Sequence, residues 1–199
     1  MTRLPAIALA LISLSLAACG KAAPPASAEP AAEPAAAPAP APRRAAPVVQ
    51  GVQLQDGGLK LIVYAGDSEI KFGQSMKATV TALDGQLGPG GKPTVNSECG
   101  EGPVTFIDWP DGLTGLFQDG KFTGWSLDRD SPKGVYVTDK RIGVGSTRAE
   151  LLAAYPEAKV ETSTLGEEFT IGGYDGILSG KAADAKVETL WAGTACVFR

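Results

Sequence analysis

Apolar residues along this chain follow the period of a helix in two places and the period of a strand in several others. Over residues 76–83 and 151–155 they recur every three or four positions, as they do on one face of an amphipathic helix. Beyond each of these stretches apolar and polar residues alternate, as in strands with one buried face. The pattern therefore predicts an α+β fold in which short helices are followed by antiparallel strands.

Both predicted helices have recognisable ends. Ser75 and Thr147 stand at the N-cap positions, and Thr147 with Glu150 forms the S/T-x-x-E capping box. Gly85 and Pro156 are expected to end the two helices, because glycine and proline both interrupt helical backbone geometry. Each helix is thus predicted to be short, with one apolar stripe facing a sheet.

The glycines before the second helix, Gly143 and Gly145, raise the question of phosphate binding. A Walker loop carries a lysine directly before its Ser/Thr, and here Gly145 occupies that position. The third glycine of a dinucleotide fingerprint is also absent. We therefore interpret this stretch as the entry of a helix.

Turn residues divide the predicted strands from one another. Asp119-Gly120, within "LFQDGKFTGW", supplies the positive φ angles that a two-residue hairpin turn requires. "WPDG" at 109–112 is a second turn signal, and "YDG" at 174–176 is expected to be its counterpart further along the chain.

The segments around the two helices resemble each other in sequence. "FGQSMKATVTAL" (72–83) aligns with "VGSTRAELLAAY" (144–155), and the stretch from Val104 aligns loosely with the stretch from Glu168. In this second alignment Asp111-Gly112 corresponds to Asp175-Gly176, Lys121-Phe122 to Lys186-Val187, and Trp125 lies near Trp191. We expect two tandem repeats, about 57–130 and about 134–199, each a capped helix followed by an antiparallel sheet of roughly three to four strands.

This arrangement resembles the small outer-membrane lipoproteins of the BamE (SmpA/OmlA) family and the tandem-repeat β-lactamase inhibitor proteins. Those proteins share a G-x-S/T helix entry, an apolar helix and an antiparallel sheet, and the likeness covers residues 70–199. The chain departs from them in having one predicted helix in each repeat. The resemblance implies a protein-binding role without catalysis.

The N-terminus resembles the signal sequence of a bacterial lipoprotein. Arg3 precedes an apolar run over residues 7–16 that is too short to span a bilayer, and "LAAC" (16–19) matches the lipobox. In that family the signal is cut before the cysteine, whose thiol carries diacylglycerol and whose new amino group is acylated, palmitate being an expected chain. The resemblance implies a signal peptide at 1–18 and a lipid anchor on Cys19. The alternative is an ordinary secretory signal in which Cys19 is incidental.

Residues 19–50 join this anchor to the rest of the chain. Their Pro/Ala-rich composition predicts a disordered tether, because it provides too little apolar surface to offset the entropy of ordering. Gly20 follows the cysteine, where inner-membrane lipoproteins of the best-studied bacteria carry Asp. The outer membrane is therefore the expected location, with residues 51–199 forming one folded domain in the periplasm.

Charge and residue types narrow the function of the folded part. Residues 51–199 hold 14 Lys and Arg against 20 Asp and Glu, a net charge near −6, which disfavours nucleic acid as a partner. The chain has no histidine, which excludes a Cys-His dyad, a Ser-His-Asp triad and His-ligated zinc. We expect no catalytic site, no cofactor and no metal. An aspartate-semialdehyde dehydrogenase name is loosely associated with similar lipoproteins, but that activity needs a nucleotide-binding fold and an activated cysteine, and the residues support neither.

Two cysteines remain beyond Cys19. In an oxidising compartment Cys99 and Cys196 most simply pair, so we predict a disulfide between them. Metal ligation or a nucleophilic role are the alternatives.

Two acidic stretches are also candidates for chemistry. The two carboxylates of the run 128–131 are candidates for binding calcium, and the alternative is that the run is an ordinary turn. Asp108 and Asp111 are candidates for an acid/base pair, and the alternative is that they cap a turn.

Aromatic residues are the remaining candidates for a binding site. They either fill the core of a small sheet domain or form an exposed surface for a protein or peptide. The surface interpretation involves Trp109, Trp125, Tyr174 and Trp191. Of these, Trp109 is expected to be the most exposed, because it lies at a predicted turn.

The function that these observations favour is a lipid-anchored scaffold or protein-binding domain whose partner is another envelope protein. A periplasmic enzyme inhibitor or a small-ligand sensor are the alternatives.

Overall fold

The computed structural model describes residues 51–63 and 66–197, which belong to one compact unit. The predicted signal peptide, Cys19 and the tether lie outside the described residues. No helix among residues 51–63 and 66–197 is long and apolar enough to cross a membrane. A small antiparallel sheet comes first in the chain and consists of β1 (Gly51–Gln55), β2 (Gly58–Ile62) and β3 (Ser68–Lys71).

Two helices and one large sheet make up the rest, which confirms a mixed fold with antiparallel sheets. The helix α1 (Met76–Leu87) precedes four strands, and α2 (Arg148–Ala154) precedes four more. These strands are β4 (Thr94–Asn96), β5 (Val104–Asp108), β6 (Leu113–Gln118), β7 (Lys121–Leu127), β8 (Lys159–Ser163), β9 (Gly166–Ile171), β10 (Tyr174–Leu178) and β11 (Val187–Gly193).

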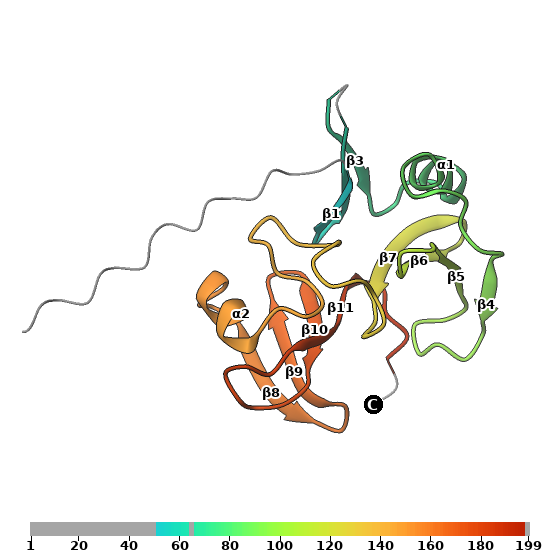
Figure 1. Cartoon of the computed structure of the whole chain (residues 1–199). Coiled ribbons are helices and arrows are strands. Elements are labelled where there is room, and N and C mark those ends of the chain that lie inside the picture. Colours follow the sequence, from blue (N-terminus) through green and yellow to red (C-terminus); the bar gives the residue numbers. More distant parts are fainter. Residues whose placement is uncertain (1–50, 64–65, 198–199) are drawn as a thin grey trace, which may run out of the picture. The chain divides into compact units, whose positions relative to one another are not determined.

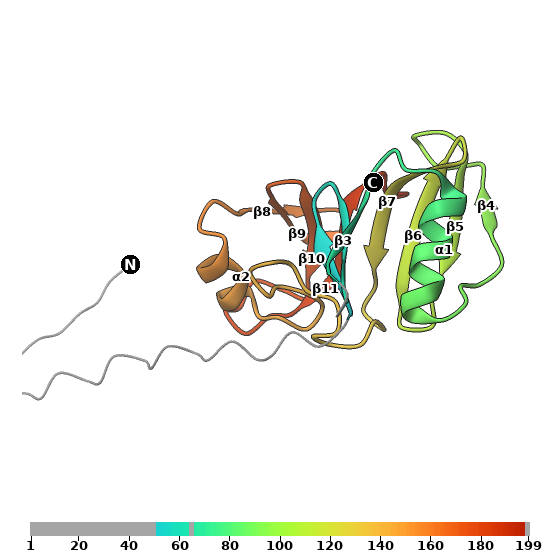
Figure 2. The same ribbon diagram turned by 90° about the horizontal axis from the view of Figure 1, so that it is seen from above.

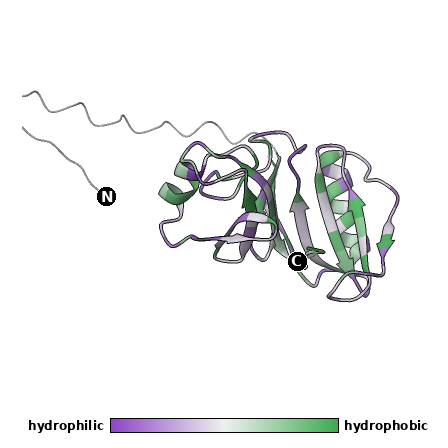
Figure 3. Ribbon diagram, turned by 90° about the horizontal axis from the view of Figure 1, so that it is seen from below, coloured by the Kyte–Doolittle hydropathy of each residue, from purple (hydrophilic) through white to green (hydrophobic). Residues whose placement is uncertain are grey.

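The eight strands lie in the order β4-β5-β6-β7-β11-β10-β9-β8, with every neighbouring pair antiparallel. The last strand of each set of four therefore lies at the centre of the sheet, where Trp125 of β7 is opposite Ala192 of β11. Figure 2 shows α1 and α2 beside opposite halves of the sheet, with the small sheet between them. Apolar stretches, green in Figure 3, occur in strands of both halves.

Both helices begin where the sequence predicted. The Ser75 hydroxyl accepts a hydrogen bond from the Ala78 N–H, and Thr147 and Glu150 form the reciprocal capping box. The end of α1 differs from the prediction, because the helix passes through Gly85 and ends at Gly88, whose φ is 83°. A glycine inside a helix costs only about 1 kcal/mol, whereas the positive φ at the helix end favours glycine strongly.

The two helix entries make matching backbone contacts with the central strands. Gly73 N–H donates to Phe122 O at 2.7 Å, and Gly145 N–H donates to Val187 O at 2.8 Å. Isolated bridges join Ser75 to Lys121 and Thr147 to Lys186 in the same way. Each helix therefore begins against the first residues of the strand that closes its own half of the sheet.

The turn predicted at Tyr174-Asp175-Gly176 is not present, because these residues lie inside β10. Gly176 is needed there because the Phe169 ring and the Thr189 carbonyl approach within 2.4 Å of where its Cβ would lie. The turn at 109–112 connects β5 to β6, and the turn that connects β9 to β10 is Gly172-Gly173. The hairpin at Asp119-Gly120 is confirmed, with φ angles of 49° and 70°.

The main core lies between the large sheet and the layer formed by the helices and the small sheet. Trp125 and Leu83 are fully buried in it, and the indole N–H of Trp125 donates to Gln55 O at 2.9 Å. The Tyr174 hydroxyl donates to Leu54 O at 3.3 Å. The small sheet is thus attached by both apolar packing and hydrogen bonds, and it has no counterpart before α2 in the described residues.

The predicted disulfide is present. Cys99 and Cys196 are bonded across a sequence separation of 97 residues, with their Cα atoms 5.2 Å apart. The bond joins the loop before β5, in the first half of the large sheet, to the segment that follows β11, the last strand.

Candidate functional site

The face of the large sheet that points away from the helices is the open face, and the strand register shows which side chains lie on it. Leu190 and Ala192 of β11 are in the main core, so the intervening Trp191 points to the open face. Its cross-strand neighbours are Ser126 and Asp175. Continuing the register in both directions gives one row across seven strands, Asp108–Thr114–Ser126–Trp191–Asp175–Thr170–Lys159.

Apolar side chains lie on either side of this row. Phe106 is opposite Leu116, and both pack in a second, smaller apolar cluster together with the disulfide. On the other side of the row Ile177 is opposite Thr189. The centre of the open face therefore carries an apolar surface. This surface faces away from the helices and is separate from the main core.

A cleft of about 400 Å³ lies over this surface, and we call it the open-face cleft. It is lined by Phe106, Leu116, Ser126, Leu127, Asp128, Leu165, Ile177, Thr189, Trp191, Ala195, Cys196 and Val197. On a flat sheet β5 and β9 would be about 24 Å apart, at roughly 4.8 Å for each strand. Phe106 of β5 and Leu165 beside β9 nevertheless line the same hollow, so the sheet curves around the cleft.

The segment after β11 forms one wall of the cleft. Residues 195–197 lie over the open face inside the curve of the sheet (Figure 1), where the disulfide at Cys196 attaches them to Cys99. Thr194 adds two hydrogen bonds, from its N–H to Thr123 O at 2.9 Å and from its hydroxyl to the Gln118 side chain at 3.2 Å. This wall is therefore held in place by covalent and polar contacts.

Polar groups are few in the cleft. The Thr189 hydroxyl oxygen is buried and makes no hydrogen bond within the described residues. Ser126 and Asp128 contribute a hydroxyl and a carboxylate, but no imidazole is available to activate either, since the chain has no histidine. The arrangement is suited to binding apolar and hydrogen-bonding groups.

The four aromatic residues proposed for a binding surface do not lie on the same face of the large sheet. Trp109, Trp125 and Tyr174 are buried in the main core, with exposed fractions of 2, 0 and 8 %. The prediction that Trp109 is the most exposed is therefore wrong. Trp191 is also largely buried, but it lies on the other face and lines the open-face cleft. The core interpretation holds for three of the four.

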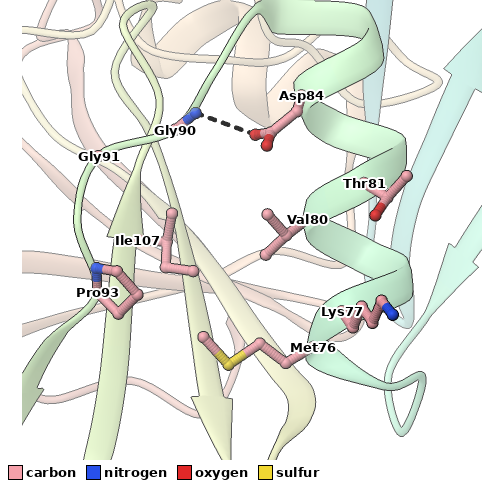
Figure 4. A pocket seen from close by; sticks show the side chains of 9 residues that line it. All are labelled: Met76, Lys77, Val80, Thr81, Asp84, Gly90, Gly91, Pro93 and Ile107. Atoms are coloured by element: carbon pink, nitrogen blue, oxygen red, sulfur yellow. Dashed lines mark hydrogen bonds between the residues drawn. The ribbon is translucent and has the colours of Figure 1, made fainter.

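A second hollow, of about 570 Å³, lies between α1 and the segment 90–93 (Figure 4). Met76 and Val80 of α1 face Ile107 and Pro93 across it, while Thr81 points away. Its one carboxylate, Asp84, already accepts hydrogen bonds from Gly90 N–H and the Trp109 indole at 3.0 and 2.9 Å. This carboxylate is thus occupied in holding the loop to the helix.

A third hollow, of about 470 Å³, is more polar and lies between the small sheet and the second half of the large sheet. The Tyr155 hydroxyl bonds to Thr138 at 2.9 Å and to Asp139 at 3.1 Å. Burial raises the pKa of Tyr155 to about 12, with smaller contributions from Asp139 and Glu157. Burial also raises the pKa of Tyr174 above its usual range. Both phenols are therefore neutral donors, and they stabilise the packing of β1 and α2.

The acidic stretches have structural roles. In the turn 128–131 the Asp128 carboxylate accepts from Asp130 N–H at 2.9 Å, while Ser131 donates to Gly112 O at 3.0 Å. Asp108 accepts from the Thr114 hydroxyl at 2.6 Å across β5 and β6, which is a strand contact and not an acid/base pair with Asp111. Within the described residues no group of three or more acidic, Cys or His side chains could hold a metal ion.

Comparison with models of protein families, with curated proteins and with solved structures yields no match to this chain. The site is therefore interpreted from its own geometry.

Sequence reasoning did not find Phe106, Leu116 and Ile177 as site residues. Their only signal is alternation within strands, which shows that two faces exist but does not show which apolar face is covered.

Proposed function

We propose that this chain is a lipid-anchored, periplasm-facing protein whose folded domain binds another envelope protein on the open face of its large sheet. The observation that carries the binding role is the open-face cleft, a largely apolar hollow on the face of the large sheet that the helices do not cover. Such a surface is typical of interaction sites, where a few apolar anchors are buried by the partner.

The anchor and the location rest on other observations. The lipobox at 16–19 supports lipidation of Cys19, and the Cys99–Cys196 disulfide is expected in an oxidising compartment such as the periplasm. The tether at 19–50 would allow the domain to reach a partner away from the membrane. The outer membrane remains the proposed location because Gly20 follows the cysteine.

We also infer that the two halves of the large sheet derive from one duplicated unit. The matching hydrogen bonds at Gly73 and Gly145, and the matching bridges at Ser75 and Thr147, support this inference. The open-face cleft lies where the two proposed copies meet, so it contains residues from both.

Site-specific photocrosslinking in living cells tests the binding role. A photoreactive amino acid at Ile177, which is half-buried beside the cleft, should capture one discrete envelope protein. The same group at Thr81, which is exposed on α1, is the control and should not capture it. Equal capture at both positions, or capture at neither, would contradict the proposed function.

The anchor is tested separately by Cys19→Ser. In the full-length protein this substitution should abolish incorporation of labelled palmitate and release the protein from the membrane fraction. The control is Cys99→Ser/Cys196→Ser, which removes both cysteines of the folded domain together, creates no free thiol there and leaves the lipobox unchanged. Retention of the Cys19→Ser protein in the membrane would refute lipid anchoring at this residue.

A further inference from the structure

Three carboxylates surround the apolar part of the open-face cleft. Asp128 lines it directly. Asp175 is opposite Trp191 and two residues from Ile177, both of which line the cleft. Asp108 lies in the same cross-strand row and is two residues from Phe106.

None of these three carboxylates forms an ion pair with a cation of the described residues. The nearby cation Arg129 is instead paired with Glu188, at 3.7 Å. Lys159 stands at the far end of the row, separated from Asp175 by Thr170. Among the described residues, therefore, no ion pair neutralises the negative charge of these three carboxylates.

Hydroxyl groups hold two of the carboxylates in place. Asp108 accepts from the Thr114 hydroxyl and Asp175 from the Thr170 hydroxyl, each at 2.6 Å. A carboxylate that is oriented by one hydrogen bond still has lone pairs for a cationic donor. These two acids are thus ordered at opposite sides of Trp191 before any partner binds.

We propose that the partner segment bound by the open-face cleft is basic and aliphatic, carrying lysine or arginine side chains next to leucine- or valine-like ones. This inference rests on the proposed function and specifies its partner. Aliphatic side chains would fill the space between Phe106, Ile177 and Trp191, and the cationic groups would reach Asp128 and Asp175. The long stems of lysine and arginine suit this arrangement, because they cover apolar surface while the charge reaches a polar rim.

Synthetic peptides test the chemistry independently of any natural partner. The row from Asp108 to Lys159 crosses six strand spacings, at most about 29 Å because the sheet curves, so an extended peptide of roughly eight residues is long enough to cover the whole row. Three peptides of that length would share four leucines or valines and two glycines, and would carry two lysines, two glutamines or two glutamates. Their binding to the purified full-length protein would be measured by calorimetry at low and high salt.

The lysine peptide should bind about tenfold more tightly than the glutamate peptide, with the glutamine peptide between them, and its advantage should shrink at high salt. The double variant Asp128→Asn/Asp175→Asn keeps both hydrogen-bond acceptors and should reduce this advantage about three- to tenfold. The matched control Asp184→Asn, in the exposed turn before β11, should leave it unchanged.

Equal binding of the three peptides, absence of measurable binding by the lysine peptide, or an undiminished lysine advantage in the double variant would overturn this inference. The crosslinking experiment at Ile177 separates its failure from that of the proposed function. If a discrete envelope protein is captured there through an acidic or uncharged segment, the binding role stands and the basic partner is refuted. If the captured segment is basic and aliphatic, both are supported.

Discussion

The indole N–H of Trp109 donates a hydrogen bond to the carboxylate of Asp84 at 2.9 Å, which ties the turn after β5 to the last part of α1. The same carboxylate oxygen accepts from Gly90 N–H at 3.0 Å (Figure 4). A tryptophan in a turn is thereby 2 % exposed, because its one polar atom has a partner inside the protein.

Removing this carboxylate should destabilise the fold. Asp84→Ala leaves two donors without their acceptor, and we expect a loss of about 1–3 kcal/mol in the free energy of unfolding. Urea denaturation followed by tryptophan fluorescence would measure it. Glu101→Ala, an exposed carboxylate in a loop, is the matched control and should change stability by about 0.5 kcal/mol or less. Equal effects of the two substitutions would contradict this role of Asp84.

The attachment of the small sheet depends on Trp125. Trp125→Phe keeps most of the ring but removes the hydrogen bond to Gln55 O, so backbone amides in β1 should exchange faster with solvent. Hydrogen exchange measured over residues 52–54 would show this. Trp191→Phe, on the open face, is the control and should leave the exchange of β1 unchanged. Acceleration of the same size in both variants would show that the effect is general loss of stability.

Loss of the disulfide should destabilise the domain strongly. For a bond between residues 97 positions apart, removal typically costs about 2–5 kcal/mol. Cys99→Ser/Cys196→Ser and reduced wild-type protein should unfold at the same lower urea concentration. A reductant should have no further effect on the double variant, and a further decrease would show that it acts elsewhere.

The acid sensitivity of the fold should depend in part on Glu167. This carboxyl is largely buried, and three neighbours lower its pKa. The hydrogen bond from the Thr162 hydroxyl has the largest effect, followed by the charges of Lys181 and Arg148. Because the pKa is lower in the folded state, the contribution to stability is complete above the ordinary glutamate pKa and disappears as the pH falls through the folded value. The difference in unfolding free energy between wild type and Glu167→Gln should therefore shrink between about pH 7 and pH 3. A constant difference would contradict the prediction.

At alkaline pH the buried tyrosines should determine stability. Burial raises the pKa of Tyr155 from 10.0 to about 12, and a group whose pKa is raised in the folded state stabilises the fold below its ordinary pKa. Stability should fall as the pH rises from 10 towards 12, together with the appearance of tyrosinate absorbance. Tyr155→Phe should make this fall shallower, and Tyr136 and Tyr174, whose pKa values burial also raises, account for the remainder.

Local signals in the sequence predicted the elements well. The N-caps at Ser75 and Thr147, the hairpin at Asp119-Gly120 and the Cys99–Cys196 pair are confirmed, because each depends on a few neighbouring residues or on a simple count. The expected turn at 174–176 was wrong. Its Asp-Gly pair lies within β10, where close packing by Phe169 and Thr189, and not a turn, requires glycine.

The sequence by itself determined that two capped helices precede alternating strands, that the folded part is acidic and that no histidine-based chemistry is available. Only the tertiary structure decided which aromatic residues lie in the core and which face of the sheet is open. Alternation assigns side chains to two faces, but which face is covered depends on where α1, α2 and the small sheet pack. The open-face cleft combines residues from five strands and the segment at Cys196, and only the order of the strands brings them together.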